Sequence, residues 1–253
     1  MQKQNNQISI IIPTMQKDID VLNMLVAELV EDNSVGEILI IDNSLNGYSY
    51  PSEKVRVYIP KKNLYVNPSW NYGIKNVKND IIGILNDDLL IPKSLCSQVL
   101  EFILKKENCG LIGLDSSKLI STKKEDFDTY PSDEVLDFQV IDDTYCTAYW
   151  GAAIFGHKSS FVLLPNRLKI WCGDNFLLLK NLQKNKECYQ IKNCVIKHLG
   201  SLTVKSVNKI SKGILEADIC YYADHFDKKY KKHSMYKKPI KRFLEKYFSI
   251  NCK

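Results

Sequence analysis

Short apolar runs alternate with amphipathic segments along the first half of the chain. Four runs have the length and the β-branched composition of strands: 8–12, 37–42, 55–59 and 81–85. Between the first two runs, apolar residues recur with the spacing of one helix face, and these are Leu22, Leu25, Val26, Leu29 and Val30. Prolines open two further amphipathic segments, 68–77 and the one after Pro92, so we expect helices there as well.

The strand runs are apolar almost throughout, which predicts a mostly parallel sheet with helices over both faces. The expected fold class is therefore α/β. Ligands of such sheets bind beyond the carboxyl ends of the strands, so the residues that directly follow the strands are the first candidates for a site. They are Thr14, Asp42, Asn43, Ser44, Asn86, Asp87 and Asp88.

The second half of the chain is less regular. Residues 116–143 are polar and charged, which predicts an excursion or loop, and a helix is expected to begin near Asp174. We expect residues 1–205 to form one domain and residues 206–253 a helical, basic appendage. The first helix of the appendage would dock through its apolar positions, which are Val207, Ile210, Ile214, Ala217 and Tyr221.

Two adjacent acids, Asp87 and Asp88, follow the strand at 81–85. Neighbouring carboxylates repel each other unless a cation joins them. A hard divalent ion, held by one or two carboxylates and by phosphate oxygens, would remove that repulsion. Each acid taken alone is more often a turn or cap residue, but their order along the chain favours a site for a metal ion and a diphosphate.

Further short segments follow one another in a regular order. They read IIIPT at 10–14, EILIIDNS at 37–44, NPSWNYG at 67–73, LNDD at 85–88, YWGAAIF at 149–155, WCGDN at 171–175 and HLGS at 198–201. In this order they resemble the motifs of GT-A-fold glycosyltransferases of the inverting family 2 type, over roughly residues 7–200. The resemblance implies a GT-A-type, mixed and mostly parallel sheet, and LNDD takes the place of the DxD motif.

The resemblance also implies roles for individual residues. Asp174 would be the general base, and Asp88 and His198 would hold a divalent metal, Mn²⁺ or Mg²⁺. The residues implied to bind the donor nucleotide are Pro13, Thr14, Asp42, Asn71 and Asp87. The residues implied to contact the acceptor are Trp150 and Gly151.

Three positions depart from the family pattern. Asn86 replaces the first acid of the DxD motif, Asn43 replaces a second acid after the strand at 37–42, and Gly173 stands where Glu is common before the catalytic Asp. The alternative for Asp174 is a structural role as the N-cap of the helix that follows. For Trp150 it is a place in the core, and for His198 a buried or capping role.

Charge is concentrated at the end of the chain. The net charge is +6, and residues 226–253 hold ten Lys/Arg against two acids, which leaves the rest slightly acidic. Residues 238–248 have the pattern of a basic amphipathic helix, suited equally to an anionic membrane surface or to packing on the domain or a second subunit. No nucleic-acid partner is expected, because the tail shows no RNA-binding motif.

Composition and cysteine spacing narrow the class further. With 45% hydrophobic and 25% charged residues the chain has the composition of a packed globular protein, and no apolar run approaches the roughly 20 residues of a membrane span. The eight cysteines form no CxxC pair. We therefore expect a cytoplasmic protein, peripheral at the cytoplasmic membrane face if the tail binds lipid.

Two functions from different classes remain at this point. One is a metal-dependent inverting glycosyltransferase that moves a sugar from a nucleotide-sugar donor, with a UDP-sugar favoured, to a glycan or glycolipid acceptor in surface polysaccharide or glycoconjugate biosynthesis. The other is a catalytically weak nucleotide-sugar or glycan binding module anchored by its basic tail. A nucleotidyltransferase is disfavoured because no glycine-rich phosphate loop follows the first strand.

Overall fold

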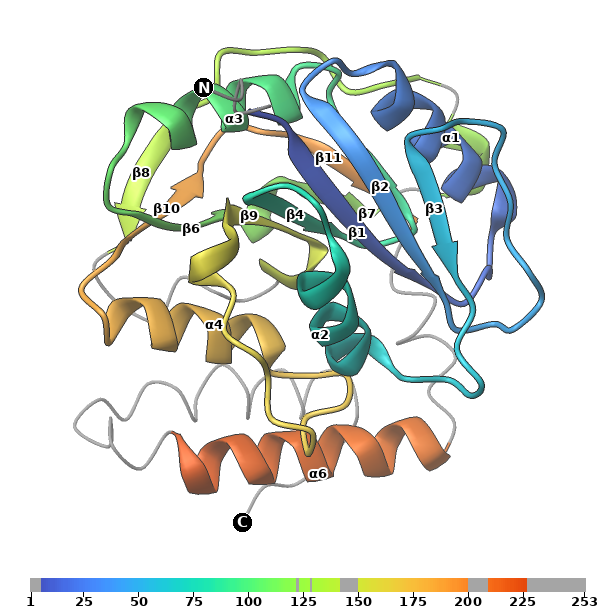
Figure 1. Cartoon of the computed structure of the whole chain (residues 1–253), viewed down its shortest axis with the longest axis vertical. Coiled ribbons are helices and arrows are strands. Elements are labelled where there is room, and N and C mark those ends of the chain that lie inside the picture. Colours follow the sequence, from blue (N-terminus) through green and yellow to red (C-terminus); the bar gives the residue numbers. More distant parts are fainter. Residues whose placement is uncertain (1–5, 122, 128, 142–149, 200–208, 227–253) are drawn as a thin grey trace.

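A computed structural model describes residues 6–121, 123–127, 129–141, 150–199 and 209–226. Its centre is an eight-stranded sheet with the order β3-β2-β1-β4-β9-β6-β10-β8, and a three-stranded sheet with the order β5-β11-β7 lies beside it (Figure 1). In the large sheet, β1 pairs in parallel with β2 and β4, β2 with β3, and β6 with β10. The other pairs, which involve β8 and β9, are antiparallel. The predicted mixed, mostly parallel α/β sheet is confirmed.

The strands of the large sheet are short, and the inner ones are well buried, whereas the edge strands β3 and β8 are partly exposed. Their bounds are β1 (Ile8–Thr14), β2 (Val35–Asp42), β3 (Val55–Tyr58), β4 (Ile81–Leu85), β6 (Cys109–Leu114), β8 (Phe138–Ile141), β9 (Ala153–His157) and β10 (Glu187–Ile191). The strands of the small sheet are β5 (Leu89–Leu90), β7 (Leu119–Ser121) and β11 (Ile196–His198). The helices are α1 (Ile19–Glu31), α2 (Val66–Asn76), α3 (Leu95–Lys105), α4 (Gly173–Leu182) and α6 (Lys209–His225).

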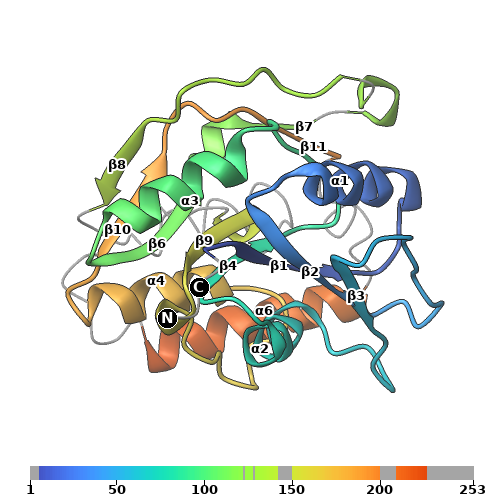
Figure 2. The same ribbon diagram turned by 45° about the horizontal axis from the view of Figure 1, so that its top comes forward.

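Alternation along the central strands builds one core on each face of the sheet. Ile10 and Ile12 of β1 pack in the same cluster as the apolar faces of α1 and α3, whereas Ile11 packs with residues of α2 and α4. Side chains of successive strand residues point to opposite faces, so a strand that is apolar throughout can feed both cores. Figure 2 shows α1 and α3 on one side of the sheet and α2, α4 and α6 on the other.

Two parts of the sheet are absent from the sequence prediction. The strand β6 carries two glycines, and glycine is unfavourable in strands. Gly113 is required there because a side chain at this position would overlap the buried ring of Trp150. The segment 116–143, expected as an excursion, contributes β7 and β8 to the two sheets. These short, polar strands form because β10 and β11 offer them pairing partners. The local sequence does not reveal such partners.

Helix α6 confirms a helix in the appendage but corrects its buried face. The buried residues are Leu215, Asp218 and Tyr222, whereas Ala217 is exposed. The face is therefore turned by about 100°, one residue of a helix, from the predicted one. Tyr222 joins the core on the α2 and α4 side of the sheet, so α6 packs directly on the sheet unit. The predicted basic helix at 238–248 lies outside the described residues.

Within the described ranges, none of the helices combines the length and the apolar character that crossing a bilayer demands.

Candidate active site

Three central strands end beside one another at one edge of the large sheet. Thr14 at the end of β1 is in register with Asp42 at the end of β2, and β4, which pairs with the other side of β1, leads into Asp87. The parallel register therefore brings the polar residues singled out after the strands to a common edge, as the sequence predicts.

A short hydrogen bond joins the ends of β1 and β4. Thr14 donates from Oγ1 to Oδ2 of Asp87 at 2.6 Å, and the same Thr14 oxygen accepts the Gln16 backbone N–H at 2.8 Å. The Met15 backbone N–H also points to Asp87 Oδ2, at 3.3 Å. Burial and the neighbouring carboxylate of Asp88 together raise the pKa of Asp87, and these hydrogen bonds oppose the rise. A nearby cation would relieve the same repulsion.

Asp88 and His198 meet although they are far apart in the sequence. His198 Nε2 lies 3.1 Å from Asp88 Oδ1, and both side chains are largely buried, with exposed fractions of 18% and 13%. Strand β11 pairs antiparallel with β5, with His198 opposite Leu89, and the backbone N–H of Leu199 donates to the Asp88 carbonyl at 3.0 Å. Among the described residues, no group of three or more His, Cys, Asp and Glu side chains forms a complete protein metal cage.

The Asp42 carboxylate organises the loop that follows β2. It is fully buried and accepts hydrogen bonds from the Ser44 hydroxyl at 2.6 Å and the Gln16 side-chain amide at 2.7 Å. The backbone N–H groups of Ser44, Gly47 and Tyr48 donate to it at 2.9–3.0 Å. Burial alone would raise the pKa of Asp42, but these hydrogen bonds outweigh it and lower the pKa. Asp42 was predicted to contact the nucleotide, and in the structure its oxygens accept these hydrogen bonds from the protein.

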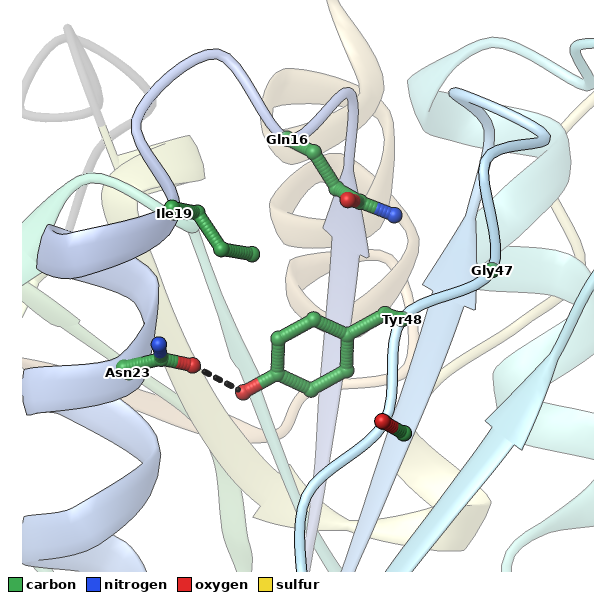
Figure 3. A pocket seen from close by; sticks show the side chains of 6 residues that line it. Gln16, Ile19, Asn23, Gly47 and Tyr48 are labelled. Atoms are coloured by element: carbon green, nitrogen blue, oxygen red, sulfur yellow. Dashed lines mark hydrogen bonds between the residues drawn. The ribbon is translucent and has the colours of Figure 1, made fainter.

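A pocket of about 230 Å³ lies next to this loop (Figure 3). Gln16, Ile19 and Asn23 line it from the start of α1 and the turn before it, and residues 47–49 line it from the β2 side. The Tyr48 hydroxyl donates to Asn23 Oδ1 at 2.9 Å, which joins two residues that line the pocket. Gln16 and Tyr48 have no motif signal of their own. Only their place in the loops that follow Thr14 and Asp42 could have drawn attention to them.

Asp174 lies in the first turn of α4 and faces the segment before β9. Its Oδ2 accepts the Gly151 backbone N–H at 3.1 Å, and its Oδ1 accepts the N–H of Asn175 at 2.9 Å. Burial raises the pKa of Asp174, and these hydrogen bonds oppose the rise. Cys172, with φ +61°, occupies the N-cap position, so the alternative of Asp174 as the N-cap is wrong. A partly buried acid with a raised pKa is suited to accept a proton.

The profile of the family described as "Glycosyl transferase family 2" matches residues 9–148. This match spans more than half of the chain. The chain belongs to glycosyltransferase family 2.

The solved structure titled "Crystal structure of S. aureus TarS 1-349" has a similar fold, with a TM-score of 0.54 and 12% sequence identity. The superposition covers 87% of this glycosyltransferase and 72% of that chain. At this level of identity the likeness concerns the fold, which is of the GT-A type. No curated protein matches the sequence at a significant level.

Two predicted contact residues of the glycosyltransferase are held by the protein itself. Trp150, in the short turn η4 (Trp150–Ala152), is fully buried and packs on Gly113, so the structure places its ring in the core and not where a sugar could stack on it. The Asn71 amide donates to the Leu164 carbonyl and accepts the Leu164 N–H, both at 2.8 Å. Asn71 thus ties α2 to the chain before α4. Pro13 lies within β1, partly buried.

Steric contacts explain why a glycine stands at position 173, directly before Asp174. A side chain at Gly173 would overlap Asn67 Oδ1 and would come within 2.8 Å of a Leu164 methyl group. Asn67 is fully buried and its Nδ2 donates to the Trp171 carbonyl at 3.1 Å. The departure from the family pattern at position 173 therefore goes together with an asparagine that occupies the same space.

Proposed function

We propose that this glycosyltransferase is metal-dependent and inverting, and that it moves a sugar from a nucleoside diphosphate donor to a hydroxyl of a glycan or glycolipid. The observation that carries the proposal is the approach of His198 to Asp88, at 3.1 Å, at the same sheet edge as the Thr14–Asp87 hydrogen bond. A side-chain pair of one carboxylate and one imidazole, beside a second carboxylate, suits a divalent ion that a diphosphate also binds.

The side chains at this edge fit a divalent cation. Asp88 offers an oxygen and His198 a nitrogen, and Asp87 adds negative charge next to them. Two protein ligands leave room for diphosphate oxygens and water, which is how Mg²⁺ is commonly held at phosphate sites. A Mn²⁺ or Mg²⁺ ion bound by Asp88 and His198 would supply the positive charge that a leaving diphosphate needs.

The donor nucleotide belongs at the carboxyl ends of β1 and β2. Asp42 holds the loop at 43–48 in place, and the pocket between Gln16, Asn23 and Tyr48 is open beside it. Its lining combines amide groups with an aromatic ring, which suits the flat, hydrogen-bonding edge of a nucleobase. In this proposal Asp42 acts on the nucleotide through Gln16 and Tyr48, which it positions by hydrogen bonds.

Asp174 is the general base of the proposed reaction. Its carboxylate takes the proton of the acceptor hydroxyl as the oxygen attacks the anomeric carbon, and the bond from that carbon to the diphosphate breaks. A single displacement from the opposite face inverts the configuration. The Gly151 N–H holds Asp174 Oδ2, so the acceptor segment and the base are tied together, and the acceptor is expected to lie beside Gly151.

A role in surface polysaccharide or glycoconjugate assembly, with a UDP-sugar as the donor, follows from the family resemblance. Contact with a membrane through residues 238–248 would bring the enzyme to a lipid-linked acceptor.

A thermal-shift panel tests the proposal. UDP, GDP, dTDP and CDP are each added with and without Mn²⁺ to the wild type, to Asp88→Asn and to Asp224→Asn, an exposed acid on α6 that serves as the matched control. One nucleotide should raise the melting temperature in a metal-dependent way in the wild type and the control but not in Asp88→Asn. A ligand at one hundred times its dissociation constant stabilises by about 2.7 kcal/mol. A flat response would contradict the proposal.

Turnover separates the enzyme from the alternative of a weak binding module. The corresponding nucleotide sugar is incubated with the wild type and with Asp174→Asn, and release of the nucleoside diphosphate is measured. Release by the wild type, lost in Asp174→Asn while nucleotide binding persists, supports catalysis. Binding with neither transfer nor slow hydrolysis in the wild type would favour the binding module. The chain would then be a member of the family that has lost activity.

A further inference from the structure

One buried acid lies outside the family motifs and outside the site described above. Asp218, in the middle of α6, is fully buried. Its Oδ1 accepts the backbone N–H of Lys169 at 2.9 Å, and its Oδ2 accepts those of Ile170 at 2.8 Å and Trp171 at 2.9 Å. Three consecutive N–H groups that point to one carboxylate form a specific anion-binding turn, and such hydrogen bonds are stronger than those between neutral groups.

The turn held by Asp218 leads directly into the candidate base. Residues 169–171 are followed by Cys172, in a left-handed conformation at φ +61°, and then by the first turn of α4 with Asp174. The direction in which α4 starts therefore depends on how this turn is held. The backbone N–H groups that Asp218 satisfies have no helix or strand partner of their own, because the turn lies between regular elements.

The opposite side of the same turn is held from α2. The Asn67 backbone N–H donates to the Lys169 carbonyl at 2.9 Å, and the Asn67 side chain donates to the Trp171 carbonyl at 3.1 Å. The N–H groups of the turn thus donate to α6, and two of its carbonyls accept from α2. If Asp218 is replaced, the hydrogen bonds from Asn67 to the turn remain. A variant at Asp218 is therefore expected to loosen the turn without releasing it altogether.

Helix α6 also contacts α4 itself. The ring of Phe226, directly after α6, lies edge-on to that of Phe176 with centroids 5.0 Å apart, and Lys180 of α4 lies over the Phe226 ring at 5.7 Å. Tyr222 is in the same core cluster as Phe176. In Figure 1, α6 runs beneath α4 and the chain that precedes it. The end of the described chain therefore braces both the turn at 169–171 and the helix that bears Asp174.

From these contacts we propose that Asp218 is a positioning residue for sugar transfer. By holding the N–H groups of residues 169–171 it sets where Asp174 stands opposite Gly151, and α6 is thereby a part of the catalytic unit. The inference rests on the proposed role of Asp174 as general base. It assigns a function to a segment that the family profile, which ends at residue 148, does not reach.

The test is a graded series in the full chain. Asp218→Asn keeps one accepting oxygen and Asp218→Ala keeps none, whereas Asp224→Asn changes an exposed acid of the same helix and serves as the control. The probes are UDP-glucose, UDP-galactose, UDP-N-acetylglucosamine and GDP-mannose with Mn²⁺, and the reading is nucleoside diphosphate release. We expect kcat to fall on the order of tenfold for Asn and a hundredfold for Ala, with the KM of the donor unchanged.

A second reading does not depend on turnover. The ¹³C resonance of the Asp174 carboxyl, assigned with Asp174→Asn, is titrated in each variant that retains the near-ultraviolet circular dichroism of the wild type. The raised pKa of Asp174 should move towards the ordinary aspartate value in Asp218→Asn, and by more in Asp218→Ala. It should stay unchanged in Asp224→Asn. A merely structural role of Asp218 would lower the melting temperature and leave the Asp174 titration as it is.

The outcomes separate this inference from the proposed function. An unchanged titration of Asp174 in Asp218→Asn overturns the inference, whatever the activity. If the titration moves but Asp174→Asn retains wild-type turnover, Asp218 positions Asp174 as inferred, and the assignment of Asp174 as the base fails. If both the titration and kcat respond in Asp218→Asn and neither responds in the control, both hold.

Discussion

His198 Nε2 lies 3.1 Å from Asp88 Oδ1, across the antiparallel pairing of β11 with β5. The two residues lie far apart in the sequence, and the small three-stranded sheet brings them together. Because β5 directly follows Asp88, any change that separates β5 from β11 also separates the two candidate metal ligands.

Replacement of His198 is expected to weaken metal-dependent nucleotide binding. In His198→Ala, Asp88 and Asp87 remain as oxygen donors, but the nitrogen ligand or the orienting partner of Asp88 is gone. We expect a loss of about tenfold to a hundredfold in Mn²⁺ affinity, measured by calorimetry in the presence of UDP. His225→Ala, at an exposed histidine of α6, should bind as the wild type does. Equal Mn²⁺ affinity in His198→Ala and the wild type would exclude His198 from the metal site.

The raised pKa of Asp174 predicts a pH-dependent stability difference. Folding keeps the proton on Asp174 to a higher pH than in the unfolded chain, where the ordinary value of 3.8 applies. The wild type therefore loses stability relative to Asp174→Asn as the pH rises from the ordinary value through the raised one. Urea unfolding of both proteins between about pH 3.5 and about pH 7 should show this trend. A difference independent of pH would contradict it.

The same shift predicts the acid limb of activity. A general base acts only when it is deprotonated, so kcat should fall as the pH drops through the raised pKa of Asp174, above the range of an ordinary aspartate. The measurement is kcat against pH with a saturating nucleotide sugar and Mn²⁺. An acid limb at the ordinary aspartate value would place the base elsewhere.

Loss of the Asp42 charge should loosen the loop after β2. In Asp42→Asn, at least one of the N–H groups at Ser44, Gly47 and Tyr48 loses its acceptor, which costs about 1–3 kcal/mol of unfolding free energy at pH 7. Because the pKa of Asp42 is lowered in the folded protein, its contribution is present above the ordinary value and lost as the pH falls through the lowered one. The difference from the wild type, measured by urea unfolding, should thus shrink in acid.

The matched control for this variant is Glu53→Gln, an exposed acid near the start of β3. It should change the unfolding free energy by no more than about 0.5 kcal/mol, as surface substitutions usually do. If Asp42→Asn behaved in the same way, the hydrogen bonds to Asp42 would contribute nothing to the loop.

Restoring the glutamate that the family favours before Asp174 should be harmful here. Gly173→Glu would push against Asn67 and Leu164, and overpacking of this kind costs about 1–3 kcal/mol. The control is Gly213→Glu in α6, where an added Cβ would meet no atom of the described residues within 4 Å, and where loss of a helical glycine stabilises by about 0.5–1 kcal/mol. Thermal unfolding distinguishes the two, and a stable, active Gly173→Glu would refute the steric explanation.

The sequence predicts the strands β1 to β4 and the helices α1 to α4 because their signals are local. A run such as Ile8–Ile12 is typical of a strand buried on both faces, and the i, i+3, i+4 spacing from Leu22 to Val30 is typical of an amphipathic helix. The candidates Thr14, Asp87 and Asp88 follow from the rule that sites lie at the carboxyl ends of parallel strands. That rule needs no coordinates.

Long-range packing decided the rest. Gly110 and Gly113 lower the strand propensity of β6, so the local sequence does not predict this strand. Trp150 is a core residue because Gly113 leaves room for its ring. The buried face of α6 is set by Asp218, a polar residue that apolar periodicity ignores and that three backbone N–H groups at 169–171 require. Local pattern thus predicted most of the regular segments and singled out the candidate residues at the strand ends. Tertiary structure decided which of them meet, because the partners of a buried polar group come from segments that the sequence does not order in space.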